Sequence, residues 1–529
     1  MNLRRFFVFF LLAVVALYAV GLNAHWRYHR DSLLYMGLGR SLAEDGSYSF
    51  NDSPHVFALP GLPAMLALVY LSVGESFLAM NILVSLFGIG CVILACFLMR
   101  ELSLSSRQAM ACVLLFGLSR SLYHYSAYVT TDVPFTFLVL VGLYCGVRML
   151  RATGRASWHW CAAAGAAACA ASLVRPLGPA LLAGLLAGLW FKREAGESSR
   201  ERLGKTALLF APFLMLLGVW ALRCVLVKGP DSKDYITLFM GRRSPVEHLE
   251  HALGVLPYYP ASIAGAILGK GLGHVVGVLL FVPVLVGFVG SVRRGDIVLC
   301  VYALVSLGAL LLISPSQRYL LPLLPLMAYW LVLGAGWIAT WLARRRPSVS
   351  SRRASQLGYL LLGLILALNL GRIGKVIYEE RSPNYYEVIN EGRLVDYFDL
   401  ADWLTENASP DDTVFTREHR FLHYFSRVKA HRLKLSEKWT HPDWLAGFLK
   451  EAQVDYVVRD PRTEEWALPV DNILRAYPEA FEKEATVGRL ELFRVRRDKL
   501  EGRAGGVAPS RWQLHFRARV DCNLKGGRA

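Results

Sequence analysis

Four ionisable residues stand where charge is rare, each close to the end of a long apolar segment. They are two acids and two arginines: Asp31, Asp132, Arg175 and Arg318. Ionisable groups at such positions are costly when unpaired and are often functional. A carboxylate can accept the proton of a nucleophile, and an arginine can bind a phosphate through paired N–H donors. Interfacial anchoring and mutual salt bridges are the alternative interpretation.

The apolar segments that carry these residues dominate the composition. The chain has 529 residues, of which 54% are hydrophobic and 19% charged. A soluble protein has about 45–50% apolar and about 25% charged residues, so we exclude a large soluble enzyme, and also a disordered or fibrous chain. Because a membrane span needs about 20 mostly apolar residues, we predict eleven transmembrane helices, near 6–24, 77–98, 108–128, 132–150, 158–174, 176–191, 206–226, 273–292, 297–314, 319–342 and 357–374. Residues 59–73 are shorter, and we expect an interfacial or re-entrant element there.

The formal net charge is +17, which fits either a nucleic-acid binder or a membrane protein with basic loops. If the eleven segments cross, one side collects most of the basic clusters, among them Arg100, Arg107, Arg148, Arg151, Arg155, Arg293, Arg294, Arg344 and Arg345. Basic loops stay cytoplasmic, so this side and the N-terminus are predicted to lie inside. We therefore expect no nucleic-acid partner. The two acids and two arginines fall on the outer face, together with His25, Arg27, His29 and Arg30.

After about residue 380 the hydrophobic runs become short and the charge rises. Residues 412–416, 454–458 and 490–495 read as strands, and residues 441–453 and 470–477 have helical spacing. Strands that alternate with helices predict a small C-terminal α/β domain, which an odd number of crossings places outside the membrane. We predict a transmembrane domain over 1–375, this extracytoplasmic domain over 380–496, and a basic disordered tail over 497–529.

Other candidates for chemistry are weak. The nine cysteines form no CxxC pair, and eight of them lie in apolar stretches, so they read as small buried hydrophobic residues. The histidine pairs His25/His29 and His419/His423 have the spacing of helical metal ligands, but solvation explains them better. We find no Gly-rich phosphate loop and no nucleophile elbow.

The segment from Asp31 and Tyr35 through Gly46 to the Pro60–Pro63 run resembles the first external loop of GT-C glycosyltransferases. This superfamily includes protein O-mannosyltransferases and the aminoarabinose transferases of lipid A. Its pattern is an acid, a Tyr four residues on, a helix, and then a Pro-rich helix at the membrane surface. Further similar features follow in order: Asp132-Val-Pro, Arg175-Pro and Arg318-Tyr319-Leu-Leu-Pro. The resemblance spans roughly residues 1–375, with a match for the outer C-terminal domain.

The resemblance implies a GT-C-like fold and an integral-membrane glycosyltransferase of the plasma (inner) membrane. The donor would be a sugar on a polyprenyl phosphate, and the acceptor a lipid, glycan or protein of the cell envelope. Asp31 would be the general base, with Asp132 a second catalytic acid. Arg175, Arg318 and Arg30 would bind the donor phosphate, supported by Tyr35 and Tyr319. Ser32 replaces the second acid that many relatives have after the first, so we assign no metal ligand and leave a divalent metal open.

Two other classes of protein fit the same apolar chain. A transporter or flippase of a lipid-linked or small substrate usually shows paired repeats and charges near the membrane midplane. A structural or assembly protein would use the C-terminal domain for docking. We find no paired halves, and the informative charges lie at one surface, which favours the enzyme.

Overall fold

The computed structural model of the chain describes residues 3–192, 198–227, 244–268, 274–313, 316–345, 351–388, 392–432 and 441–500. They form two compact units. As far as they are described, unit 1 comprises Met1–Tyr28, Phe57–Leu226 and Asp234–Arg381, and unit 2 comprises His29–Val56, Val227–Lys233 and Ser382–Ala529. The predicted basic tail lies outside the described residues from position 501 onward.

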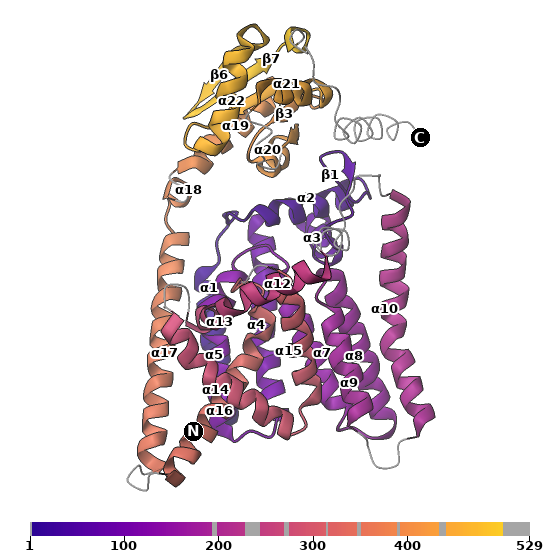
Figure 1. Ribbon diagram of the computed structural model, residues 1–529, viewed down its shortest axis with the longest axis vertical. Helices are drawn as coiled ribbons and strands as arrows, with labels where there is room; N and C mark the ends of the chain where they lie inside the picture. The colour runs from indigo at the N-terminus through magenta and orange to yellow at the C-terminus, as the bar shows by residue number, and fades with distance from the viewer. Residues whose placement is uncertain are drawn as a thin grey trace. The chain divides into compact units, whose positions relative to one another are not determined.

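Unit 1 is built of helices in its described residues (Figure 1). They are α1 (Leu3–Gly21), α3 (Gly61–Val73), α4 (Phe77–Glu101), α5 (Ser106–Gly117), α6 (Arg120–Ser126), α7 (Asp132–Met149), α8 (Gly154–Val174), α9 (Pro179–Phe191), α10 (Ser199–Val227), α12 (Pro245–Val255), α13 (Tyr259–Leu268), α14 (His274–Arg293), α15 (Ile297–Leu311), α16 (Leu324–Arg345) and α17 (Ser351–Glu380), with short 3-10 turns η1 (Leu256–Tyr258) and η2 (Leu321–Leu323).

Within the described part of the chain, six helical stretches are long and apolar enough to cross a membrane. They are Phe77–Glu101, Asp132–Met149, Ser199–Val227, Val275–Arg293, Leu321–Arg345 and Gly358–Glu380. Shorter apolar helices accompany them at Arg5–Gly21, Gly61–Val73, Pro179–Phe191 and Ile297–Leu311. The chain is therefore a mostly helical, multi-pass membrane protein, while the count of eleven crossings stays a prediction.

Two parts of unit 1 differ from the sequence prediction. The expected single helix over 108–128 is broken into α5 and α6, because the Ser119 side chain accepts a hydrogen bond from the Leu122 N–H and so caps a new helix. Helices α12 and α13 were not predicted. Each has only 11 or 10 residues, too few to stand out in a search for membrane spans.

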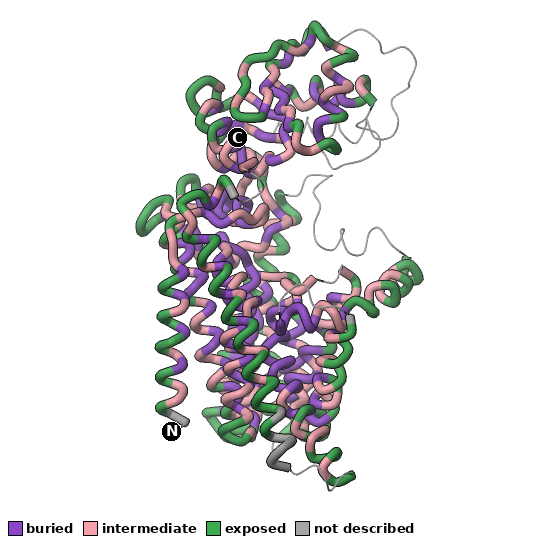
Figure 2. The backbone as a smooth tube through the Cα atoms, turned by 90° about the vertical axis from the view of Figure 1, so that its left-hand side faces the viewer, coloured by how far each residue is buried: buried purple, intermediate pink, exposed green. Residues whose placement is uncertain are grey.

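Glycines let the helices of unit 1 approach closely. A Cβ on Gly334 of α16 would clash with the Pro283 carbonyl oxygen of α14, and one on Gly165 of α8 would lie 3.0 Å from the Leu209 backbone of α10. Small residues at helix contacts are typical of membrane bundles. Large apolar side chains such as Leu214 and Val225 of α10 are exposed, as expected where lipid is the solvent. Figure 2 shows buried, intermediate and exposed residues along the helices of unit 1.

Unit 2 combines a mixed sheet with helices. Its helices are α2 (Arg30–Glu44), α18 (Tyr385–Val388), α19 (Arg393–Asn407), α20 (His419–Ser426), α21 (Pro442–Glu451) and α22 (Glu464–Ala476), with 3-10 turns η5 (Pro478–Ala480) and η6 (Arg497–Leu500). Its strands are β1 (Ser49–Phe50), β2 (Ser53–Pro54), β3 (Thr413–Phe415), β4 (Lys429–His431), β5 (Tyr456–Arg459), β6 (Phe481–Val487) and β7 (Leu490–Val495).

The five-stranded sheet of unit 2 has the order β4-β3-β5-β7-β6. Strands β4, β3 and β5 are parallel to one another, and β7 is antiparallel to both of its neighbours, β5 and β6. Strands β3, β5 and β7 and helix α21 fall where the sequence predicts them, because their apolar residues form a buried cluster that includes Phe415, Leu449, Val457 and Val495. Strands β4 and β6 were missed, since β4 is only 3 residues long and β6 contains three consecutive charged residues, Glu482, Lys483 and Glu484.

Residues 29–56 pack with the C-terminal segment rather than with the membrane helices next to them in sequence. Arg40 of α2 shows how: its guanidinium is buried, donates to the Tyr424 carbonyl at 3.0 Å and lies 4.6 Å from the Tyr424 ring. Helix α2, which carries Asp31, is therefore held by α20, nearly 400 positions along the chain.

Candidate active site

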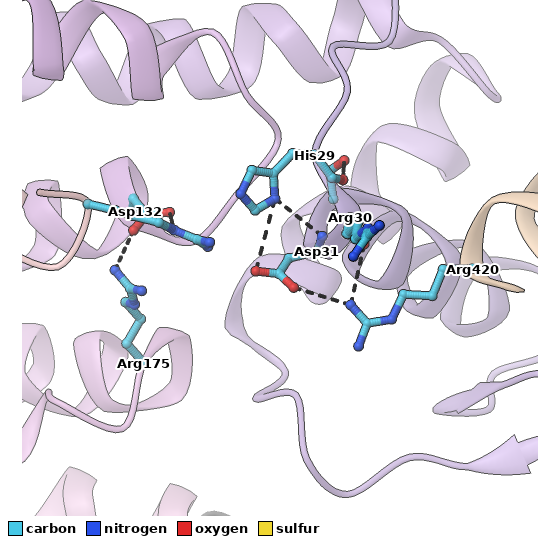
Figure 3. Close-up of polar contacts among 8 residues, drawn as sticks. His29, Arg30, Asp31, Asp132, Arg175 and Arg420 are labelled. Atoms are coloured by element: carbon cyan, nitrogen blue, oxygen red, sulfur yellow. Dashed lines mark hydrogen bonds and ion pairs between the residues drawn. The ribbon is translucent and has the colours of Figure 1, made fainter. Parts of the chain in front are cut away.

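A buried carboxylate between two arginines forms the first charged cluster, which lies in unit 1. One Asp132 oxygen accepts a hydrogen bond from Arg175 Nη1 and the other from Arg318 Nε, both at 2.6 Å (Figure 3 shows the first pair). The Asp132 side chain is fully buried, and each arginine is 14% exposed. The structure thus brings together three of the residues singled out in the sequence.

Local backbone structure positions these three side chains. Asp132 begins α7, where the unpaired N–H groups of the first turn favour a negative charge. Arg175 ends α8 in an extended conformation, as expected before Pro176, because the proline ring disfavours helical geometry at the preceding residue. Arg318 lies in a turn directly before η2, and its carbonyl accepts from the Leu321 N–H at 3.3 Å.

The cluster carries more positive than negative charge. Two guanidinium groups face one carboxylate, and Arg175 also lies 5.3 Å from the Tyr319 ring. An arginine has five N–H donors, so contact with one carboxylate oxygen leaves its planar fork able to bind further oxygens. The arrangement is suited to a phosphate that approaches from the partly exposed side of the arginines.

The same geometry does not suit Asp132 as a base or a metal ligand. Both of its oxygens accept strong charge-assisted hydrogen bonds and neither reaches solvent. A divalent cation would have to displace a guanidinium. Among the described residues, no group of three or more His, Cys, Asp or Glu is placed to hold a metal ion.

The second charged cluster lies in unit 2 and contains Asp31. His29 caps α2, since its Nδ1 accepts a hydrogen bond from the Asp31 N–H at 3.2 Å. Asp31 thus lies in the first turn of the helix. Arg420 Nη1 of α20 donates to Asp31 Oδ1 at 3.2 Å, and the carboxylate stays 39% exposed (Figure 3). Unlike Asp132, Asp31 therefore remains accessible to a substrate. Tyr35 follows one turn later on the same face of α2.

Arg30 belongs to this second cluster, not to the arginines of unit 1. Its Nη2 lies 2.8 Å from Glu418 Oε1, and Glu418 is only 5% exposed. Sequence reasoning missed both Glu418 and Arg420. The run Arg417-Glu418-His419-Arg420 stood out only for its histidine.

The histidines of α20 serve the fold. Burial, with Arg420 and Arg432 nearby, lowers the pKa of His419 to about 3, so the ring is neutral at physiological pH. Both nitrogens of His423 have backbone partners: Nε2 accepts from the Asn51 N–H at 3.0 Å, and Nδ1 donates to the Val428 carbonyl at 3.1 Å. This tautomer leaves no lone pair for a metal ion.

A further charged pair holds the loop after α1 in unit 1. The Arg27 guanidinium lies 2.8 Å from the Glu380 carboxylate and donates to the Gly21 and Ala127 carbonyls. Both side chains are at most 5% exposed. Arg27, one of the basic residues expected on the outer face, thus ties the end of α1 to the ends of α6 and α17; the face itself stays a prediction.

Comparisons with known proteins agree with this architecture. The family model described as dolichyl-phosphate-mannose-protein mannosyltransferase matches residues 68–235, less than half of the chain. The structure is similar to ArnT from Cupriavidus metallidurans bound to undecaprenyl phosphate, with a TM-score of 0.62 and 15% sequence identity, over 95% of this chain and 99% of that one. It is also similar to the archaeal oligosaccharyltransferase AglB from Archaeoglobus fulgidus, in complex with an inhibitory peptide and a dolichol-phosphate. There the TM-score is 0.56 and the identity 11%, over 96% of this chain and 75% of that one. No curated protein matches.

This chain thus has the fold of the GT-C proteins, and the resemblance noted in its sequence is confirmed at the level of the fold. Within that class it is similar to the protein mannosyltransferase family over residues 68–235 and to ArnT over nearly its whole length.

Proposed function

We propose that the protein is an integral-membrane glycosyltransferase that takes a sugar from a polyprenyl-phosphate donor and transfers it to an acceptor of the cell envelope. The observation that carries the proposal is the pair of arginines held on the buried Asp132. The structures of ArnT with undecaprenyl phosphate and of AglB with dolichol-phosphate support a lipid-phosphate donor. A donor with a lipid tail suits a chain whose described helices are largely apolar.

Arg175 and Arg318 are proposed to bind the donor phosphate. The bond between the anomeric carbon and the phosphate oxygen breaks in the reaction, and the phosphate departs with the electron pair. Its negative charge therefore grows in the transition state. Two preorganised guanidinium groups in a partly dry site stabilise that charge more than they stabilise the ground state, which is the requirement for catalysis. Because Arg30 pairs with Glu418 in unit 2, we assign the phosphate to Arg175 and Arg318 alone.

Asp31 is proposed as the general base. It would accept the proton as an acceptor oxygen or nitrogen forms its bond to the anomeric carbon. General base catalysis contributes about 10²–10⁴-fold to a rate. A single displacement inverts the anomeric centre. Asp132 then has a positioning role, since it fixes the two arginines rather than contacting the acceptor. Tyr35 and Tyr319 support the two clusters, and no step is routed through a metal.

The proposal includes a topology. Eleven crossings with a cytoplasmic N-terminus place the α/β domain of residues 380–496 on the outer face of the plasma membrane, after a transmembrane domain over 1–375. The basic segment 497–529 follows it. On this topology the acceptor lies outside the cytoplasm, where lipid-phosphate donors are used in place of nucleotide sugars.

Transfer by the purified protein tests the proposal. We expect sugar to move from a polyprenyl-phosphate donor to a cell-envelope extract, and Asp31→Asn to reduce transfer at least about 100-fold while the thermal unfolding temperature stays unchanged. Full activity of Asp31→Asn would remove this residue from the mechanism. Absence of transfer across several donors, together with substrate flux in vesicles, would favour a transporter.

The phosphate role has its own control. Arg175→Gln should weaken the binding of undecaprenyl phosphate about tenfold or more, because a charge-assisted hydrogen bond is lost. Arg151→Gln is the matched control, since Arg151 follows the opposite end of α7 and pairs with Glu101 at 2.9 Å. Equal donor affinity in the two variants would contradict the assignment.

A further inference from the structure

A cluster of five arginines in unit 2 is not explained by the proposed chemistry. It consists of Arg30, Arg393, Arg417, Arg420 and Arg432, which come from four separate stretches of the chain. The sheet explains part of the convergence. Strands β3 and β4 are parallel neighbours, so the residues that follow them, Arg417 and Arg432, emerge at the same edge. Arg30 and Arg393 begin helices α2 and α19, and Arg420 lies in the first turn of α20.

Glu418 lies at the centre of the arginine cluster. Its Oε1 is 2.8 Å from Arg30 Nη2, 3.9 Å from Arg417 Nε and 4.0 Å from Arg393 Nη2. Since Glu418 is 5% exposed, the cluster extends into the interior of unit 2 rather than over its surface. A single carboxylate oxygen is thus shared among three guanidinium groups.

The positive charge of the cluster exceeds its negative charge. Among the described residues, five arginines face two carboxylates, Glu418 and Asp31, because the buried Asp460 nearby is paired with Arg462 at 3.1 Å. Burial and the neighbouring arginines lower the pKa of Arg432, as expected where positive charges outnumber negative ones. The buried Nε of Arg393 has no hydrogen-bond partner among the described residues. A buried donor without an acceptor is costly, so this N–H marks a place for an incoming acceptor atom.

Exposure is graded across the cluster. The side chain of Arg30 is 40% exposed and that of Arg420 is 31%, whereas Arg417 is 22% and Arg393 15% exposed. The open end carries Asp31, to which Arg420 donates at 3.2 Å. A small anion that entered from this end would therefore meet guanidinium donors within reach of the proposed general base.

We propose that the arginine cluster binds an anionic group, a phosphate or carboxylate, on the glycosyl acceptor. This inference rests on the proposed function, because Asp31 is taken as the base that acts on the same acceptor. Guanidinium groups bind phosphates and carboxylates through paired N–H donors, and several arginines around one oxyanion add geometric specificity to charge attraction. The acceptor is thus an anionic molecule, held by its charge beside Asp31. A phospholipid headgroup has the same chemistry, and the experiment separates the two sources.

Binding of inorganic phosphate to the full-length protein in neutral phosphatidylcholine nanodiscs is the first test, and it requires no sugar transfer. We expect Arg432→Gln and Arg393→Gln each to weaken phosphate binding about tenfold at constant ionic strength, and Arg432→Lys to restore part of it. Arg496→Gln is the matched control, since Arg496 pairs with Glu482 and is 55% exposed at the far end of β7. Unchanged phosphate affinity in both cluster variants, with both still folded by thermal unfolding, would overturn the inference.

Transfer kinetics and lipid competition identify the source of the anion. With an active enzyme, Arg432→Gln should raise the KM for an anionic acceptor about tenfold, and leave the KM for the donor unchanged. Nanodiscs that contain phosphatidylglycerol should not compete with phosphate. Competition by phosphatidylglycerol, with an unchanged acceptor KM in Arg432→Gln, would assign the cluster to a lipid headgroup and refute the acceptor role. If no sugar transfer is found while phosphate binding responds as expected, the proposed function fails and the anion site stands.

Discussion

Replacement of Asp132 by Asn separates the positioning role of this residue from a role as base. Asparagine has nearly the same shape, but it removes the negative charge. It also turns one oxygen into an NH₂ donor that faces a guanidinium donor. Both Asp132 contacts are 2.6 Å long and the carboxylate is fully buried. Removing one partner of a buried ion pair costs about 3–5 kcal/mol. We therefore expect a clear fall in the free energy of unfolding.

Donor binding should fall together with stability. Arg175 and Arg318 lose the anchor that fixes their orientation, so undecaprenyl phosphate should bind about tenfold or more weakly. Glu101→Gln is a close control, because Glu101 also joins two arginines, Arg148 at 3.0 Å and Arg151 at 2.9 Å, but is 19% exposed. An ion pair near the surface contributes about 0–1 kcal/mol, so this variant should keep both its stability and its donor affinity.

The assays are thermal unfolding of the purified protein, titration with undecaprenyl phosphate, and the dependence of kcat/KM on pH. If Asp132 positions the arginines, the acidic limb of the pH profile persists in Asp132→Asn, because the base is elsewhere. If stability and donor affinity are unchanged while the acidic limb disappears, Asp132 is itself the base and our reasoning is wrong.

Two further predictions concern the fold. The pKa of His419 is lowered to about 3 in the folded protein. Below pH about 6.5 the histidine of the unfolded chain therefore binds a proton that the folded protein does not bind, and the free energy of unfolding falls as the pH drops. His419→Gln should remove up to about 1.4 kcal/mol per pH unit of that slope, measured as the unfolding free energy between pH 7 and pH 5; an unchanged slope would show that the histidine is protonated in the fold. Gly334→Ala should cost about 1–3 kcal/mol through the clash with the Pro283 carbonyl. Gly336→Ala should be neutral in the same thermal assay, because a Cβ at this position would lie 3.8 Å from its nearest neighbour, the Gln108 side chain. Equal stability of the two variants would refute the close approach of α14 and α16.

Much of the membrane part could be predicted from local sequence, since the length and hydropathy of a helix reveal it without knowledge of its neighbours. Long apolar runs such as those of α4 and α16 were predicted within a few residues. The break between α5 and α6 was not, because it depends on a single capping serine inside an apolar run. Helices α12 and α13 were missed for their shortness.

The candidate site divides in the same way. Asp132, Arg175 and Arg318 could be chosen from the sequence, because an ionisable residue at the end of an apolar segment is rare and costs free energy when it is unpaired. Their roles could not be predicted, because only the contacts show that both Asp132 oxygens are bound by arginines in a fully buried site, whereas the Asp31 side chain is 39% exposed. Glu418 and Arg420 gave no sequence signal, since charges in a polar segment are ordinary.

The sequence by itself therefore determined a helical membrane architecture and singled out the charges at the ends of apolar segments, because hydropathy and the cost of charge in lipid are local properties. The GT-C-like fold was implied by the resemblance of a few short motifs. Tertiary structure alone decided which acidic and basic side chains form ion pairs. The association of residues 29–56 with the C-terminal segment brings Arg30 and Asp31 to Glu418 and Arg420, almost 400 positions away. Contacts at that separation depend on the packing of α2 against α20 and on the parallel pairing of β3 with β4, which no local pattern encodes.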